Sequence, residues 1–147
     1  MKENEIENVT TQLYHLLPLL QKKIYRPFQQ VKKTNISPMQ VRSMILLREK
    51  GSMTMTELAS EMLVSKPQLT PLIDKLIDGE LVERENEKDD RRIIKISLTS
   101  LGREALESHK KEMLEMLKNK IDFLNMEDLA ALDAALDQVV KVISKLP

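Results

Sequence analysis

The chain contains no cysteine and only three glycines, and its apolar runs are short. Without cysteine there is no disulfide, no thiolate nucleophile and no cysteine-ligated zinc. Three glycines do not suffice for a glycine-rich phosphate loop, and no nucleophile–base pair or paired-carboxylate motif stands out. The longest apolar runs, such as Met44 to Leu47, fall far below the roughly 20 residues that a bilayer-spanning helix needs. We therefore expect a soluble cytoplasmic protein that is not an enzyme and uses neither metal nor cofactor.

The chain also lacks an overall charge, although not a local one. Its 147 residues carry 23 basic and 23 acidic side chains, a balance that on its face disfavours a nucleic-acid partner. Residues 21–50, however, carry eight Lys or Arg against Glu49 alone, a net charge of +7. Three interpretations stay open for this segment: a solvated helix face, the lining of an anion pocket, or contacts to duplex phosphates. The candidates for phosphate contacts are Lys32, Lys33 and Arg42.

Apolar spacing and capping residues predict helices in the first half of the chain. Apolar residues at three- and four-residue intervals from Ile6 to Ile24 predict an amphipathic helix that Pro18 should kink. A second helix starts at Ser37, with Pro38 in its first turn and Gln40 placed for a capping box. It ends at Lys50-Gly51.

Two shorter helices follow and are joined by a tight turn. Thr54 begins the first of them, and Ser65 caps the second, which ends near Gly79. The expected buried stripe of the second helix consists of Leu69, Leu72, Ile73 and Leu76. Two helices with so short a connection are typical of a helix-turn-helix.

The periodicity then changes to that of strands. Residues 81–85 and 92–99 predict a two-stranded hairpin, with Ile94, Ile96 and Leu98 alternating onto one face. A lone hairpin is marginally stable unless it packs on helices, and directly after a helix-turn-helix it is a wing. Helices starting at Thr99 and Asn125 complete the chain, the last with a coiled-coil-like apolar seam. The predicted fold is mainly α with a small β-hairpin wing.

The segment from Asp90 to Gly102, DRRIIKISLTSLG, resembles the wing signature of the MarR family, D-x-R, an alternating strand and then L-T-x-x-G. Four further segments are similar to that family, in the same order: Ile36–Gln40, Thr56–Ala59, Ser65–Leu76 and Leu81–Arg84. The close resemblance covers residues 36–105.

The resemblance implies a homodimeric winged helix-turn-helix transcription regulator, usually a repressor, that binds a pseudo-palindromic double-stranded operator. Residues 1–35 and 100–147 would be dimerisation helices, and residues 36–99 the DNA-binding lobe. Members of the family typically release DNA when a small lipophilic or phenolic anion, or an oxidant, acts on them.

The helix after Ser65 is the expected recognition helix, and its polar face carries the candidates for DNA contact. Gln68 suits adenine, Lys66 or Lys75 suits phosphate or guanine, and the hydroxyls of Ser65 and Thr70 lie near the start. Pro71 stands where the family often has arginine, and it should cost a helical hydrogen bond and bend the helix. We expect it to read A·T pairs by touching a thymine methyl. A second departure is that the family's glycine before the Leu-Val strand is displaced to Gly79.

At the wing, Arg91 and Arg92 follow Asp89-Asp90. A wing arginine suits the narrow, negative minor groove of A·T-rich DNA. By the resemblance, Arg92 enters that groove and Asp90 is the carboxylate that orients it. The competing interpretation is an exposed hairpin tip whose charges pair locally.

The remaining candidates are Tyr14, Tyr25 and Phe28, which could line an effector pocket, although aromatics at helical spacing are more often core residues. The sequence thus predicts a sequence-specific double-stranded DNA-binding regulator. The alternative is a winged-helix module that binds protein and has no sequence-specific DNA binding.

Overall fold

The computed structural model describes all 147 residues, which form two compact units. The helical body consists of residues 1–31 and 112–147, and the winged lobe of residues 32–111. Neither unit contains a helix of the length and apolarity that crossing a membrane requires.

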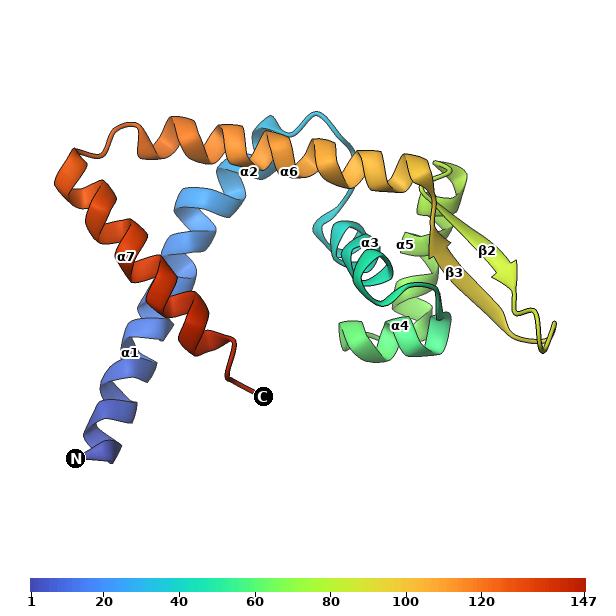
Figure 1. Cartoon of the computed structure of the whole chain (residues 1–147), viewed down its shortest axis with the longest axis horizontal. Coiled ribbons are helices and arrows are strands. Elements are labelled where there is room, and N and C mark those ends of the chain that lie inside the picture. Colours follow the sequence, from blue (N-terminus) through green and yellow to red (C-terminus); the bar gives the residue numbers. More distant parts are fainter. The chain divides into compact units, whose positions relative to one another are not determined.

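The winged lobe has the predicted order of helices followed by a hairpin. Its elements are α3 (Pro38–Lys50), β1 (Met53–Thr54), α4 (Met55–Met62), α5 (Lys66–Asp78), β2 (Val82–Asn86), β3 (Ile94–Leu98) and the start of α6 (Ser100–Ile121) (Figure 1). The predicted helix starts are confirmed. Ser37 and Ser65 each make a full capping box, and Thr54 Oγ1 accepts a hydrogen bond from the backbone of Glu57.

The sheet differs from the predicted lone hairpin because it has a third strand. Strand β1 pairs antiparallel with β3 through Met53↔Ile96 and Thr54↔Lys95, giving the order β1-β3-β2. Two residues are too few to show strand periodicity, so the sequence did not reveal β1. The hairpin itself runs in register from Val82↔Leu98 to Asn86↔Ile94. Ile94 is half exposed, because the wing extends beyond the helices of the lobe (Figure 1).

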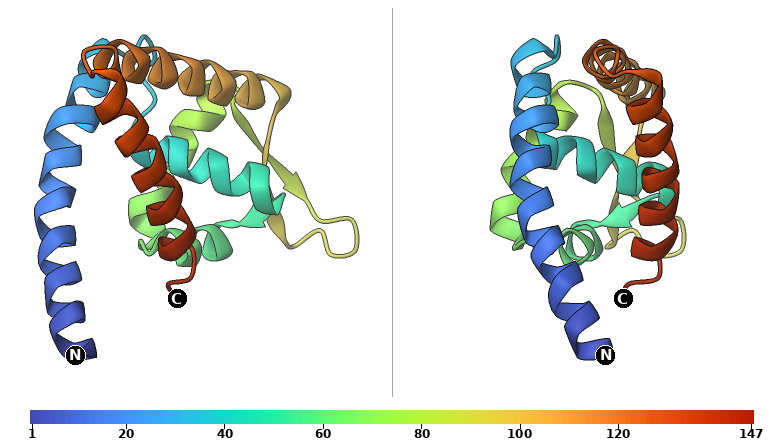
Figure 2. Two further views of the ribbon diagram at one scale, coloured as in Figure 1. Left: turned by 60° about the vertical axis from the view of Figure 1, so that its left-hand side comes forward. Right: turned by 90° about the vertical axis from the view of Figure 1, so that its left-hand side faces the viewer.

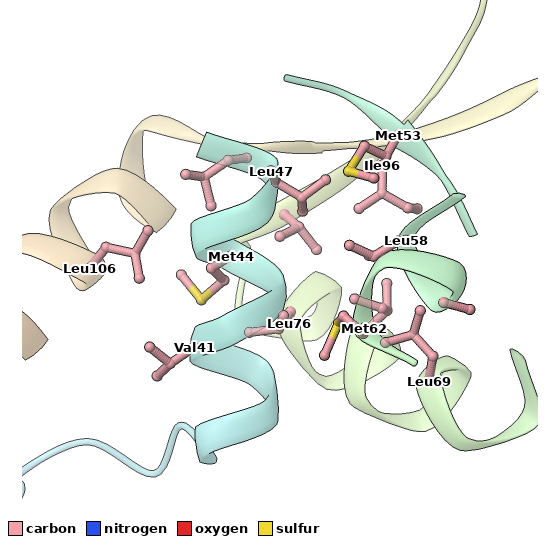
Figure 3. Close-up of a cluster of buried hydrophobic side chains, with 14 residues drawn as sticks. Val41, Met44, Leu47, Met53, Leu58, Met62, Leu69, Leu76, Ile96 and Leu106 are labelled. Carbon is pink, nitrogen blue, oxygen red and sulfur yellow. The ribbon is translucent and has the colours of Figure 1, made fainter. Parts of the chain in front are cut away.

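The core of the lobe lies between α3, the α4–α5 pair, the sheet and the first turns of α6. Met44 and Leu47 of α3 are buried against Leu106 of α6 and Ile96 of β3 (Figure 3). The predicted stripe of α5 is buried at Leu69, Ile73 and Leu76, and half-buried at Leu72. This packing fixes which face of α5 remains in solvent.

Helix α5 is bounded by two left-handed residues that are not glycine. Leu63 (φ 56°) closes α4, with Leu63 N–H bonded to Ser60 O and Val64 N–H to Ala59 O. Glu80 (φ 58°) closes α5 in the same way, with the Leu81 N–H bonded to Leu76 O at 2.9 Å. Glu80 therefore occupies the left-handed position where glycine is ordinarily preferred, and Gly79 precedes it in a right-handed conformation (φ −82°).

The L-T-x-x-G segment joins the wing to α6 at a close backbone approach. Thr99 Oγ1 accepts a hydrogen bond from Gly102 N–H at 3.0 Å and lies 2.7 Å from Glu80 O. A Cβ atom at Gly102 would lie 2.1 Å from Leu81 O. Only glycine therefore fits at this crossing.

The helical body is built of helices from both ends of the chain (Figure 2). Its elements are α1 (Lys2–Leu20), the π-helix η1 (Gln21–Tyr25), α2 (Arg26–Val31), the end of α6 and α7 (Met126–Ile143). After Pro18, which was predicted to kink the helix, α1 continues to Leu20 and passes into the π-helix. Asn125 caps α7 as predicted. Most apolar side chains of α1 and α7 are exposed in the single chain. Neither α1 nor α7 buries a single residue, although Leu17, Leu136 and Val140 lie on them.

Candidate DNA-binding surface

The predicted contact residues of α5 all lie on the exposed side of the lobe. The six are Ser65, Lys66, Gln68, Thr70, Pro71 and Lys75. They share this side because the apolar stripe opposite them is packed into the core. The helix therefore presents its polar face to solvent, and an α-helix fits the major groove.

Capping engages two of these residues. Gln68 Oε1 accepts hydrogen bonds from Ser65 N–H at 3.0 Å and from the Ser65 hydroxyl at 3.1 Å. A bidentate contact to adenine uses both Oε1 and Nε2 of a glutamine. Gln68 thus offers only its Nε2 donors while it remains in the cap.

The first half of α5 carries two exposed prolines one turn apart. Pro67 lies in the first turn, and Pro71 lies beyond it, inside a helix that continues to Asp78. Because Pro71 has no N–H, the Pro67 carbonyl loses its usual helical partner. The two rings form an exposed apolar ridge on the polar face.

A salt bridge connects the recognition helix to the wing. Arg84 Nη2 of β2 donates to Asp74 Oδ1 of α5 at 2.7 Å, and both side chains are about half exposed. The contact links the two elements that carry the candidate DNA contacts. Sequence reasoning did not find it, since the two residues belong to different elements and show no shared local pattern.

At the hairpin tip the backbone is organised by side-chain hydrogen bonds. Asp90 Oδ1 accepts from the Arg92 backbone N–H at 3.0 Å, and Asn86 Nδ2 donates to Arg91 O. The Asp90 carboxylate therefore contacts the backbone of Arg92, whereas it was predicted to orient the Arg92 side chain. Arg91 and Arg92 are both exposed, and neither is in an ion pair within the chain.

The three basic candidates next to α3 have different environments. Lys33 and Arg42 are exposed, whereas Lys32 is half-buried. The Lys32 ammonium donates to Ile36 O at 2.6 Å. Its nitrogen is therefore directed toward the chain's own backbone.

The three aromatic candidates do not meet in one pocket. Tyr14 is 74% exposed with its ring 5.5 Å from that of His15, Tyr25 is half-buried and Phe28 is fully buried. A cavity of about 620 Å³ in the helical body is lined by other residues of α1 and α7: Val9, Gln12, Leu13, His15, Leu16, Leu19, Gln138, Val139, Val142 and Ile143.

Gln40 is a buried polar residue whose second contact was not predicted. Its Oε1 makes the expected capping bond, while Nε2 donates to Leu72 O of α5 at 3.1 Å. The side chain is 5% exposed. No sequence pattern indicates a contact across 32 residues.

Comparison with known proteins agrees with this architecture. The model of the MarR family matches residues 36–94. The transcriptional regulator YsmB of Bacillus subtilis is 31% identical over 101 residues, which cover 69% of each chain. The regulator YpoP of the same species is 26% identical over 142 residues, covering 94% of this chain and 96% of YpoP. The structure of a Staphylococcus aureus MepR mutant bound to an oligodeoxyribonucleotide superimposes with a TM-score of 0.66 at 19% identity, covering 91% of this chain and 97% of that one. This chain therefore belongs to the MarR family of DNA-binding transcription regulators.

Proposed function

We propose that the protein is a homodimeric repressor that occupies a pseudo-palindromic operator and releases it when a small effector binds. The observation that carries the proposal is the pairing, in one lobe, of an exposed recognition-helix face with a wing tip whose two arginines, Arg91 and Arg92, are exposed and in no ion pair. The first suits a major groove and the second a flanking minor groove.

Helix α5 would enter the major groove with its N-terminal turns. Lys66 and Lys75 supply positive charge, and Thr70 Oγ1, which donates to Lys66 O at 2.8 Å, keeps its lone pairs available as acceptors. Pro71 would contact a thymine methyl, because a proline ring offers only apolar surface. Lys33 and Arg42 are exposed and would reach the flanking phosphates.

The wing would place Arg92, supported by Arg91, in the adjacent minor groove. In this role Asp90 shapes the tip through its bond to the Arg92 N–H, and leaves the guanidinium free for the groove. A narrow minor groove attracts arginine because its potential is more negative than that of the major groove.

A second copy of the chain would cover the apolar faces of α1 and α7. These helices bury nothing in the single chain, yet carry exposed Leu17, Leu136 and Val140 among others. Exposed apolar surface of this extent marks an interface. A two-fold dimer would read two half-sites about one helical turn apart, roughly 10 base pairs.

Release by a small lipophilic or phenolic anion is part of the proposal because it is typical of the family. Such a ligand shifts the equilibrium only if it binds the DNA-free state more tightly. Titration of candidate anions into the preformed operator complex tests this directly.

The decisive test is a mobility-shift titration of the protein against the region upstream of its own gene, with a scrambled duplex of equal length as control. We expect the upstream duplex to be shifted at a protein concentration at least about 100-fold lower than the scrambled one, and the stoichiometry to be two chains per site. Equal shifts of both duplexes, or binding by a single chain, would refute a dimeric sequence-specific repressor.

A further inference from the structure

Three hydrogen bonds form a continuous chain from the first residue of the winged lobe to the middle of the recognition helix. Lys32 Nζ donates to Ile36 O at 2.6 Å, Ser37 N–H donates to Gln40 Oε1 at 2.8 Å, and Gln40 Nε2 donates to Leu72 O at 3.1 Å. We call this series the Lys32–Leu72 relay.

The links are directly connected, because Ile36 C=O and Ser37 N–H belong to one peptide group. When the Lys32 ammonium withdraws electron density at the carbonyl, the N–H of the same peptide becomes a stronger donor. The side chain of Gln40 then connects this peptide group to α5. In each of the three bonds an N–H group donates to an oxygen atom.

Gln40 suits its place in the relay because its amide both accepts and donates. Its Oε1 faces an N–H and its Nε2 faces a carbonyl, so only one orientation of the amide satisfies both partners. The side chain is 5% exposed, so water does not readily replace either bond. An ionised glutamate of the same shape would keep the first bond and lose the second.

The relay ends one residue beyond the proline inside α5. Leu72 directly follows Pro71, which lacks the N–H of a regular helical turn. A bond from α3 at this point restrains the segment that follows the proline. The relay therefore fixes the recognition helix relative to the chain segment that enters the lobe.

We propose that Lys32 and Gln40 are positioning residues for operator recognition, and that Lys32 acts through the relay and not as a phosphate contact. The inference rests on the proposed DNA-binding function. It predicts different effects on the affinity for the operator and on the affinity for non-specific DNA. Reading base edges requires α5 to be held within about 0.5 Å of its productive position, whereas non-specific binding needs only charge near phosphates.

The test compares operator and scrambled-duplex affinities across a salt series for the wild type, Lys32→Met, Gln40→Glu and the double variant. Lys33→Met is the matched control, since it removes the same charge from the neighbouring exposed position. For Lys32→Met we expect about a 5-fold loss of operator affinity, an unchanged salt slope and unchanged scrambled-duplex binding.

For Gln40→Glu we expect a larger, about 20-fold, loss of operator affinity, with the affinity for the scrambled duplex unchanged. The double variant should lose little more operator affinity than Gln40→Glu alone. Lys33→Met, as a phosphate contact, should instead lower both affinities and reduce the salt slope by about one. A reduced slope for Lys32→Met, no operator loss, or additive losses in the double variant would each overturn the inference.

Amide hydrogen exchange measured in the absence of DNA tests the relay independently of the proposed function. Amides of residues 72–78 in α5 should exchange faster in Lys32→Met and Gln40→Glu than in the wild type, while those of α4 are unchanged. If the wild type does not prefer its operator, the proposed function fails even when exchange changes as expected. If exchange in α5 is unchanged, the relay fails even when the operator is bound.

Discussion

Arg84 Nη2 lies 2.7 Å from Asp74 Oδ1, so that the second strand of the sheet is tied to the recognition helix by one charged pair. The side chains are 51% and 50% exposed. Half-exposed pairs are screened by water and contribute little to stability, typically under about 1 kcal/mol. The pair is of interest for position rather than stability, since it joins α5 to the hairpin whose tip is proposed to contact DNA.

We expect a double-mutant cycle of Arg84→Met and Asp74→Asn to give a coupling free energy of unfolding below about 1 kcal/mol. Urea denaturation of the four proteins measures it. A coupling above about 2 kcal/mol would show that the pair is a stability determinant and contradict this interpretation.

Gly102→Ala should destabilise the winged lobe severely, by about 3 kcal/mol or more. The added Cβ would lie 2.1 Å from Leu81 O and 2.6 Å from Leu98 Cδ1, and the backbone atom cannot rotate away. Gly79→Ala is the matched control, since its nearest contact is an ordinary 3.5 Å. Thermal unfolding compares them, and an equal Tm for both variants would refute the steric argument.

Glu80→Gly should stabilise the protein by about 1 kcal/mol, because a side chain in the left-handed region carries a steric cost that glycine avoids. Glu80 has φ 58° and closes α5. Glu80→Ala retains a Cβ and should leave stability nearly unchanged. If the alanine variant gained as much as the glycine variant, loss of the carboxylate would be the cause instead.

Arg92→Ala should weaken operator binding by about 1–3 kcal/mol without lowering the Tm, because the side chain is exposed and unpaired in the free chain. Lys88→Ala on the same hairpin removes an equal charge and should have a smaller effect. Fluorescence anisotropy with an A·T-rich flank and a G·C-rich flank measures both. Unchanged affinity for Arg92→Ala would remove this residue from the mechanism.

Pro71→Arg should change the base preferred at one position of each half-site from A·T toward G·C, because arginine pairs with guanine while proline offers only apolar contact. Selection of sites from a randomised operator library checks it. Identical preferred bases at every position for wild type and variant would show that Pro71 does not read DNA.

Local chemistry in the sequence determined most of the elements of the lobe and the start of α7 in the helical body. Ser37, Thr54, Ser65 and Asn125 cap helices where their hydroxyl or amide groups predict, since capping involves residues only three apart. The alternation of Ile96 and Leu98 likewise marked β3. The exposed face of α5 followed from its apolar stripe.

Contacts between distant segments were decided only by the tertiary structure. Strand β1, the Asp74–Arg84 pair and the Gln40–Leu72 bond each join groups on separate elements, and no periodicity encodes them. The structure also changed the roles expected of two residues. The Lys32 ammonium donates to the Ile36 carbonyl, and the Asp90 carboxylate accepts from the Arg92 backbone N–H.

The sequence by itself thus determined where the capped helices of the lobe begin, where the β2–β3 hairpin lies and which side of α5 stays in solvent, because caps and periodicity act over a few residues. Tertiary structure decided what holds α5 in place and which charged groups remain unpaired, because partners are set by packing across the lobe.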